Sequence, residues 1–183
     1  MLGWRRWGWR PGRARHRRRN ARRQDGGPSM RPFADAAAAP LPDWAAWFQG
    51  DWQLSRQVTD RRAGTVLHFE GRLAVTVENS RLRLDETGRW TDAPWGALAG
   101  HRVYLWVPEG RGRVQVLYGD GRPFHAFTPV QQGRATARHL CDPDTYDVTY
   151  VFDLPACWQH RWDVTGPAKD YTMLTRLTRP VSA

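Results

Sequence analysis

The stretch from Ala135 to Arg179 constrains the fold of this chain more than any other. Apolar and polar residues alternate in it along three runs. The runs are Tyr146, Val148, Tyr150 and Phe152; then Trp158, His160, Trp162 and Val164; then Tyr171, Met173, Thr175 and Leu177. Because side chains along a strand point to opposite faces with period two, each run predicts a half-buried strand. Short loops rich in Asp, Pro and Gly separate the runs, which is typical of antiparallel strands in a meander.

Seven further strands are expected before these three. Their expected extents are 50–58, 65–77, 81–86, 102–107, 113–118, 123–127 and 135–141, with a loop over 87–100. In the first of them, Trp52, Leu54, Arg56 and Val58 share one face. Gly71 is expected to form a β-bulge in the long second strand. The pair Asp120-Gly121 predicts a two-residue hairpin turn.

Ten short strands and one short helix predict an all-β protein, a single antiparallel up-and-down β-barrel. An even number of strands lets the first and the last pair and close the barrel. The helix is expected over 43–48, with Asp43 as its N-cap, where its aromatic face would plug one end. Closure would bring Arg179 beside Trp52, where a guanidinium over an indole is a favourable structural contact.

The positive charge of the chain is concentrated at its beginning. The formal net charge is +10, but residues 1–29 hold ten Arg and one Asp, which leaves a net charge of +1 for the remainder. A basic domain face that binds nucleic acid is therefore not expected. We divide the chain into an Arg-rich disordered head (1–29), a Pro- and Ala-rich linker (30–42) and a barrel domain (43–180). For the head, three alternatives stay open: translation that starts at Met30, a basic tail that touches anionic surfaces, and an organelle transit peptide.

The two cysteines, Cys141 and Cys157, flank the expected strand over 146–152. At about 3.3 Å per residue they would lie roughly 20 Å apart, too far for a disulfide. Free thiols and a cytoplasmic location are the expectation. No run approaches the roughly 18 apolar residues of a membrane-spanning helix, and the oligomeric state stays open.

Pairing of the last four strands predicts the composition of the barrel wall. If Cys141 opposes Tyr146, Phe152 opposes Trp158 and Val164 opposes Tyr171, one face is aromatic and polar while the other is charged. The inner face would hold His139, Cys141, Tyr146, Tyr150, His160, Trp162, Tyr171 and Thr175. The outer face would hold Arg138, Asp147, Thr149, Arg161, Asp163 and Arg176.

An inner face of Tyr, Trp and His is more typical of a lined cavity than of a dry core. These residues, with His125 at the rim and Lys169 at the mouth, would bind a small apolar or aromatic ligand that carries a polar or anionic group. The alternative for each residue is that it satisfies a neighbour in a packed core. No metal site is expected, because His139 and Cys141 lack the close spacing of further ligands that zinc sites use.

Several motifs resemble those of the domain-of-unknown-function family 6314 over about residues 48–179. They are Glu86-x-Gly88, Arg102-x-Tyr104-x-Trp106, the segment 120–125 that ends in Phe-His, His139-x-Cys141-x-x-Asp144-x-Tyr146, Trp162, and the Gly166-Pro-x-Lys-Asp-Tyr171 loop. The resemblance implies a small bacterial lipocalin-like or nitrobindin-like barrel and no known activity. Gly50-x-Trp52 together with Arg179 is similar to the pattern of the wider lipocalin superfamily.

Four hypotheses of function follow. The first is a barrel that binds a small-molecule ligand, with no cofactor required. The second is an isomerase or hydratase in the same cavity, in which His139 or His160 would act with Tyr150. The third is a haem protein, as the nitrobindin-like resemblance would allow. The fourth is a structural domain that binds a partner through its outer wall.

Overall fold

The computed structural model describes residues 41–92, 96 and 98–180 of the chain. The basic head and most of the expected linker lie outside the described residues, as do Pro94 and Trp95 of the expected 87–100 loop. The elements in chain order are α1 (Trp44–Phe48), β1 (Gly50–Asp60), β2 (Thr65–Glu78), β3 (Arg81–Trp90), β4 (Ala99–Glu109), β5 (Arg113–Tyr118), β6 (Pro123–Phe127), β7 (Gln132–Cys141), β8 (Asp144–Asp153), β9 (Cys157–Gly166) and β10 (Lys169–Thr178).

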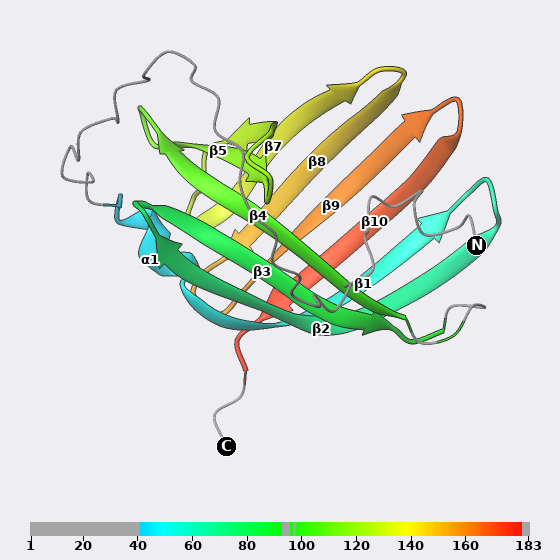
Figure 1. The fold of residues 1–183 in the computed structure, drawn as a ribbon, viewed down its shortest axis with the longest axis horizontal. Coiled ribbons are helices and arrows are strands. Elements are labelled where there is room, and N and C mark those ends of the chain that lie inside the picture. Colours follow the sequence, from blue (N-terminus) through cyan, green and yellow to red (C-terminus); the bar gives the residue numbers. More distant parts are fainter. Residues whose placement is uncertain (1–40, 93–95, 97, 181–183) are drawn as a thin grey trace, which may run out of the picture.

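The ten strands form one antiparallel sheet that curves into a nearly closed barrel (Figure 1). The strand order is β6-β5-β4-β3-β2-β1-β10-β9-β8-β7, so the first and the last strand pair as predicted. The free edges are instead β6 and β7. These two strands lie next to each other, but no ladder joins them among the described residues.

The register of the last three strands follows the prediction. Phe152 pairs with Trp158, and Val164 pairs with Tyr171. On the outer face of these strands, Arg161 forms an exposed ion pair with Asp163 at 2.8 Å. The predicted separation of an aromatic inner face from a charged outer face is therefore confirmed for β8, β9 and β10.

The predicted pairing of Cys141 with Tyr146 is wrong by two residues. Cys141 pairs with Asp144, and His139 pairs with Tyr146. The turn between β7 and β8 contains only residues 142 and 143, which is tighter than expected from the Asp-Pro-Asp sequence. Because a shift of two keeps every side chain on its face, the predicted division into inner and outer residues is unaffected.

The predicted bulge at Gly71 is also wrong. Gly71 pairs with Leu54 on one side and with Gly88 on the other, in two uninterrupted ladders. A Cβ atom on Gly71 would lie 2.1 Å from the carbonyl oxygen of Thr87. The two glycines therefore allow the backbones of β2 and β3 to approach closely where the sheet bends. β3 continues to Trp90, so part of the expected 87–100 loop is strand.

The helix α1 lies at one end of the barrel, as expected (Figure 1). Phe48 is fully buried and packs edge-on against Trp106 and Trp158, with ring centroids 5.0 and 5.5 Å away. Asp43 stands at the N-cap position, but its backbone is helical (φ −53°, ψ −34°) and its side chain makes no capping bond. Packing of the aromatic face, rather than capping, therefore holds this short helix.

The expected contact between the two ends of the barrel chain is present. The guanidinium carbon of Arg179 lies 3.8 Å from the ring centroid of Trp52. The indole nitrogen of Trp52 donates a hydrogen bond to the carbonyl of Phe48 at 2.7 Å. β1, β10 and α1 are thus tied together at one corner of the barrel.

Candidate functional site

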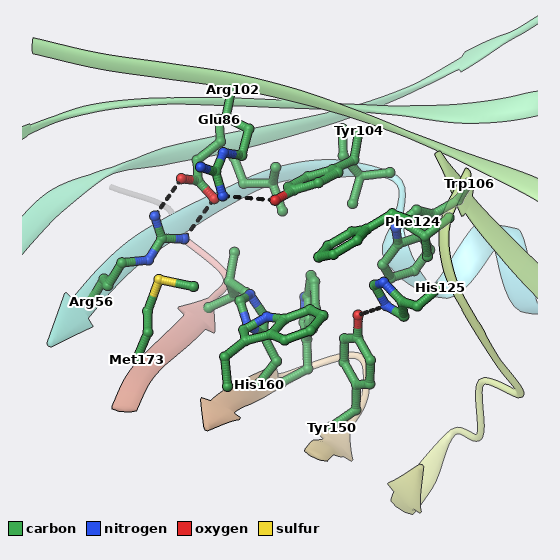
Figure 2. Close-up of a pocket in the computed structure, with 16 residues that line it drawn as sticks. Arg56, Glu86, Arg102, Tyr104, Trp106, Phe124, His125, Tyr150, His160 and Met173 are labelled. Carbon is green, nitrogen blue, oxygen red and sulfur yellow. Dashed lines mark hydrogen bonds and ion pairs between the residues drawn. The ribbon is translucent and has the colours of Figure 1, made fainter. Parts of the chain in front are cut away.

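A small cavity lies inside the barrel. Its volume is about 40 Å³, which is room for roughly three water molecules. The polar residues that line it are Arg56, Glu86, Arg102, Tyr104, His125, Tyr150 and His160; the apolar ones are Leu73, Leu84, Trp106, Val116, Phe124, Trp158, Trp162, Met173 and Leu177. Figure 2 shows that the charged groups gather on one side and that His125 and Tyr150 lie on the other.

A buried ion pair forms the charged side of the cavity. The two terminal guanidinium nitrogens of Arg56 donate to the two carboxylate oxygens of Glu86, at 2.6 and 2.7 Å. Its Nε donates to the hydroxyl of Thr175 at 2.8 Å. All three residues are at most 5% exposed. The fork-to-fork geometry and the third bond are what a buried pair needs to offset the loss of hydration.

Arg102 brings a second guanidinium to the same cavity. It donates a hydrogen bond to the hydroxyl of Tyr104 at 2.8 Å. Burial acts to lower the pKa of Arg102, but Tyr104 and Glu86 outweigh this effect, so the pKa is raised and the charge is kept. The lining of the cavity thus holds two guanidinium groups and one carboxylate. In a low-dielectric interior a guanidinium group attracts an anion.

The two histidines of the cavity add no charge at neutral pH. Burial, with a smaller effect from the nearby His139, lowers the pKa of His125 to about 3. Burial also lowers the pKa of His160 well below its usual value, and the charge of Arg56 acts in the same direction. Both rings are therefore neutral, and each has one bare nitrogen and one N–H.

His125 is paired with a tyrosine across the barrel. Its Nε2 lies 2.7 Å from the hydroxyl of Tyr150, and both residues are buried. Burial raises the pKa of Tyr150 well above its usual value, so the hydroxyl stays protonated. The pair is a neutral phenol–imidazole contact that could transfer a proton to or from a bound molecule.

Three buried nitrogen atoms on cavity-lining residues lack a hydrogen-bond partner among the described residues. They are Nδ1 of His125, Nδ1 of His160 and Nε1 of Trp158. Buried polar groups are nearly always bonded in folded proteins, so these three nitrogens on cavity-lining residues are candidates for contact with a polar ligand. The Trp158 nitrogen can only donate, so it would need an acceptor on that ligand.

A β-bulge places Phe124 in the cavity. Val116 pairs with His125 and Leu117 pairs with Pro123, which leaves Phe124 as the extra residue of β6. Neighbouring residues of a regular strand point to opposite faces, but here both Phe124 and His125 line the cavity. The ring of Phe124 stacks on that of Trp162 at 5.0 Å.

The structure brings four of the nine expected binding residues to the cavity. These are His125, Tyr150, His160 and Trp162. His125 was expected only at the rim, but it is 6% exposed and is the histidine that bonds to Tyr150. The expected partners of Tyr150 were His139 and His160 instead.

The other five expected residues lie outside the cavity lining: His139, Cys141, Tyr146, Lys169 and Tyr171. Lys169 pairs with Asp144 at 2.6 Å and also donates to the hydroxyl of Tyr146, so its charge is compensated within the barrel wall. Cys141 is exposed, Cys157 is half-buried, and both are free thiols. A role for these residues in ligand binding remains a prediction.

Sequence reasoning did not select Arg56, Glu86, Arg102 or Phe124 as binding residues, although two signals were present. Arg56 shares the inward face of β1 with Trp52, Leu54 and Val58 in the predicted pattern. Glu86 and Arg102 stand in the motifs that resemble the family. A charged residue in an inward position is the signal that would have found the ion pair. No comparable signal marks Phe124, because a bulge changes the alternation.

Within 41–92, 96 and 98–180, no group of three His, Cys, Asp or Glu side chains could hold a metal ion. In the same residues, no helix has the length and apolar character to cross a membrane.

The sequence over residues 48–179 matches the family described as "Family of unknown function (DUF6314)". The chain belongs to this family. No curated protein matches it. Among solved structures, the fold is similar to that of the S-type phycobiliprotein lyase CPES from Guillardia theta, with 13% identity and a TM-score of 0.58. The alignment covers 76% of this family member and 92% of the lyase. A redesigned β-barrel, mFAP1, bound to DFHBI, aligns with 14% identity, a TM-score of 0.39 and coverage of 74% and 97%.

Proposed function

We propose that the barrel binds a small aromatic ligand that carries one anionic group, with the anion directed to Arg102. The observation that carries this proposal is the guanidinium of Arg102 in an aromatic-lined cavity, beside the Arg56–Glu86 ion pair. The unpartnered nitrogens of His125, His160 and Trp158 supply further polar contacts. Similarity in fold to a phycobiliprotein lyase supports the barrel architecture only.

The ligand must enlarge the cavity when it binds. The cavity volume is about 40 Å³, whereas a benzene-sized cavity has about 150 Å³ and ligand pockets generally have about 300 Å³ or more. Haem, the third hypothesis from the sequence, has weaker support for this reason. Purified protein that develops no Soret band after haem addition would exclude it.

The test uses 2-naphthoate as a planar anionic probe and 2-naphthamide as its neutral counterpart, with affinities measured by titration calorimetry. We expect the protein to prefer naphthoate, and Arg102→Gln to remove that preference while Arg102→Lys retains most of it. Equal affinities for the two probes, or no binding of either, would refute the proposal. Circular dichroism checks that each variant is folded.

A second candidate function, a proton-transfer enzyme in the same cavity, is favoured by the 2.7 Å contact between His125 and Tyr150. The reaction considered is removal and return of a proton at a carbon next to a carbonyl, in which the imidazole, with its pKa of about 3, is a weak base and the phenol is the proton donor. Incubation of phenylpyruvate in D₂O would test this function by NMR. Exchange at its methylene faster than in buffer, reduced by Tyr150→Phe, is the expected result, and an unchanged buffer rate would contradict it.

A further inference from the structure

Phe124 occupies an aromatic slot that crosses the barrel. Its ring lies nearly parallel to Trp162 on β9, at 5.0 Å and 14°. It also stacks on Tyr118 of β5, at 4.6 Å and 27°, and on Tyr104 of β4, at 5.9 Å and 10°. β9 is far from β4 and β5 in the strand order, so these partners belong to opposite walls. Figure 2 shows Phe124 projecting between Tyr104 and His125.

Phe124 lies on a short edge strand, so its ring is easier to move than the side chains of the other cavity residues. β6 has five residues and pairs only with β5. Phe124 is the unpaired bulge residue of that strand, and it is only partly buried. Across the open edge it touches His139 of β7, with ring centroids 4.9 Å apart. No ladder between β6 and β7 among the described residues opposes an outward movement at this point.

We propose that Phe124 is an internal substitute for the aromatic part of the ligand and that a planar aromatic anion binds by displacing it. The vacated slot has an indole on one side and two phenol rings on the other, which is the lining that a flat ring prefers. One of these phenols, Tyr104, accepts a hydrogen bond from Arg102 at 2.8 Å, so the slot adjoins the guanidinium of Arg102. The ligand enters between the free edges of β6 and β7. This inference rests on the function proposed above and names the site and class of its ligand.

Displacement has a measurable consequence for affinity. A ligand that must first expel a side chain binds only to the fraction of molecules in which that side chain is already out. Removing the ring removes this restriction. We therefore expect Phe124→Ala to bind 2-naphthoate at least about tenfold more tightly than the unmodified chain. Phe124→Leu, which keeps apolar volume without a stacking ring, should show a smaller gain and guards against loss of folding in the alanine variant.

Phe127→Ala is the matched control. Phe127 is on the same strand and is more deeply buried, at 3% exposure, but it does not line the cavity. It stacks on Tyr150 at 4.3 Å. This variant also loses an aromatic ring from β6, so it reports the general effect of loosening the strand. We expect it to bind 2-naphthoate no more tightly than the unmodified chain does.

The outcomes separate this inference from the proposed function. If the unmodified chain binds naphthoate through Arg102 but neither Phe124 variant binds more tightly, the displacement is refuted and the function stands. If a folded Phe124→Ala protein and the unmodified chain both fail to bind naphthoate, the proposed function itself fails. A tenfold gain in Phe124→Ala that is absent in Phe127→Ala and is lost on adding Arg102→Gln supports both.

Discussion

Removal of the Glu86 carboxylate tests the energetic role of the buried charges. In Glu86→Leu, Arg56 loses two charge-assisted hydrogen bonds of 2.6 and 2.7 Å and keeps the bond to Thr175. Each such bond contributes about 1.5–3 kcal/mol. Breaking one side of a buried pair generally costs about 3–5 kcal/mol, because a charge is left uncompensated. Here the cost should reach at least that range, since Arg102 faces the same cavity.

Urea unfolding followed by tryptophan fluorescence measures this loss. With a slope of about 2 kcal/mol per molar urea, a loss of about 4 kcal/mol lowers the midpoint by roughly 2 M. The exposed pair of Arg138 with Asp147 provides the control. Asp147→Asn should cost less than about 1 kcal/mol, because solvent screens that pair.

The double variant Arg56→Leu/Glu86→Leu provides the decisive comparison. It removes both partners of the ion pair, whereas Glu86→Leu alone leaves the charge of Arg56 buried without the carboxylate that it bonds. We therefore expect the double variant to be more stable than the Glu86→Leu single variant, by about 1–3 kcal/mol. A single variant that costs less than about 1 kcal/mol, or a double variant that is no more stable than the single, would refute the reasoning about buried charge.

Three further predictions concern stability. Because the pKa of His125 is lowered to about 3, its contribution to stability should be full above about pH 6.5 and should fall by about 1.4 kcal/mol per pH unit below it. The lowered pKa of His160 adds to the slope, so in urea titrations His125→Gln should reduce the slope by about 1.4 kcal/mol per pH unit and leave the contribution of His160. Arg179→Met removes the cation over Trp52 and should lower the free energy of unfolding by about 1 kcal/mol at any salt concentration; an unchanged value would contradict this. Gly71→Ala places a Cβ atom 2.1 Å from a backbone oxygen of β3 and should lower the free energy of unfolding by about 1–3 kcal/mol. Gly110→Ala, with open space around it, should leave stability nearly unchanged. Equal melting temperatures of the two variants would disprove the close approach of β2 and β3.

Much of the barrel was predictable because it depends on local alternation. Strands β5 and β6 have the predicted bounds, and the pairs Phe152–Trp158 and Val164–Tyr171 have the predicted register. The turn between β7 and β8 is tighter than its composition indicates, so the predicted partner of Cys141 is wrong by two residues. The period-two pattern still assigns each side chain to the right face of the sheet when it assigns the wrong pairing partner on the next strand. A shift of one residue would instead bury the charged side chains.

The candidate site was less predictable because its contacts join distant parts of the chain. The side chains of Arg56 and Thr175 are 119 residues apart in sequence and 2.8 Å apart in space. His125 was expected at the rim, yet it meets Tyr150 across the barrel. Two inward side chains meet only if the closure of the sheet and the tilt of the strands bring them to the same height in the barrel. Alternation along one strand contains no information on closure or tilt.

By itself, the sequence determined the strands, their inward and outward faces and the family, because these follow from side-chain alternation and from motifs. Only the tertiary structure decided that the barrel stays open between β6 and β7, that a bulge turns Phe124 inward, and that two guanidinium groups and one carboxylate line the same cavity. The physical reason is that closure of a sheet is a global balance of strand tilt and stagger, and a single extra residue at an edge strand can change the side on which a ring lies.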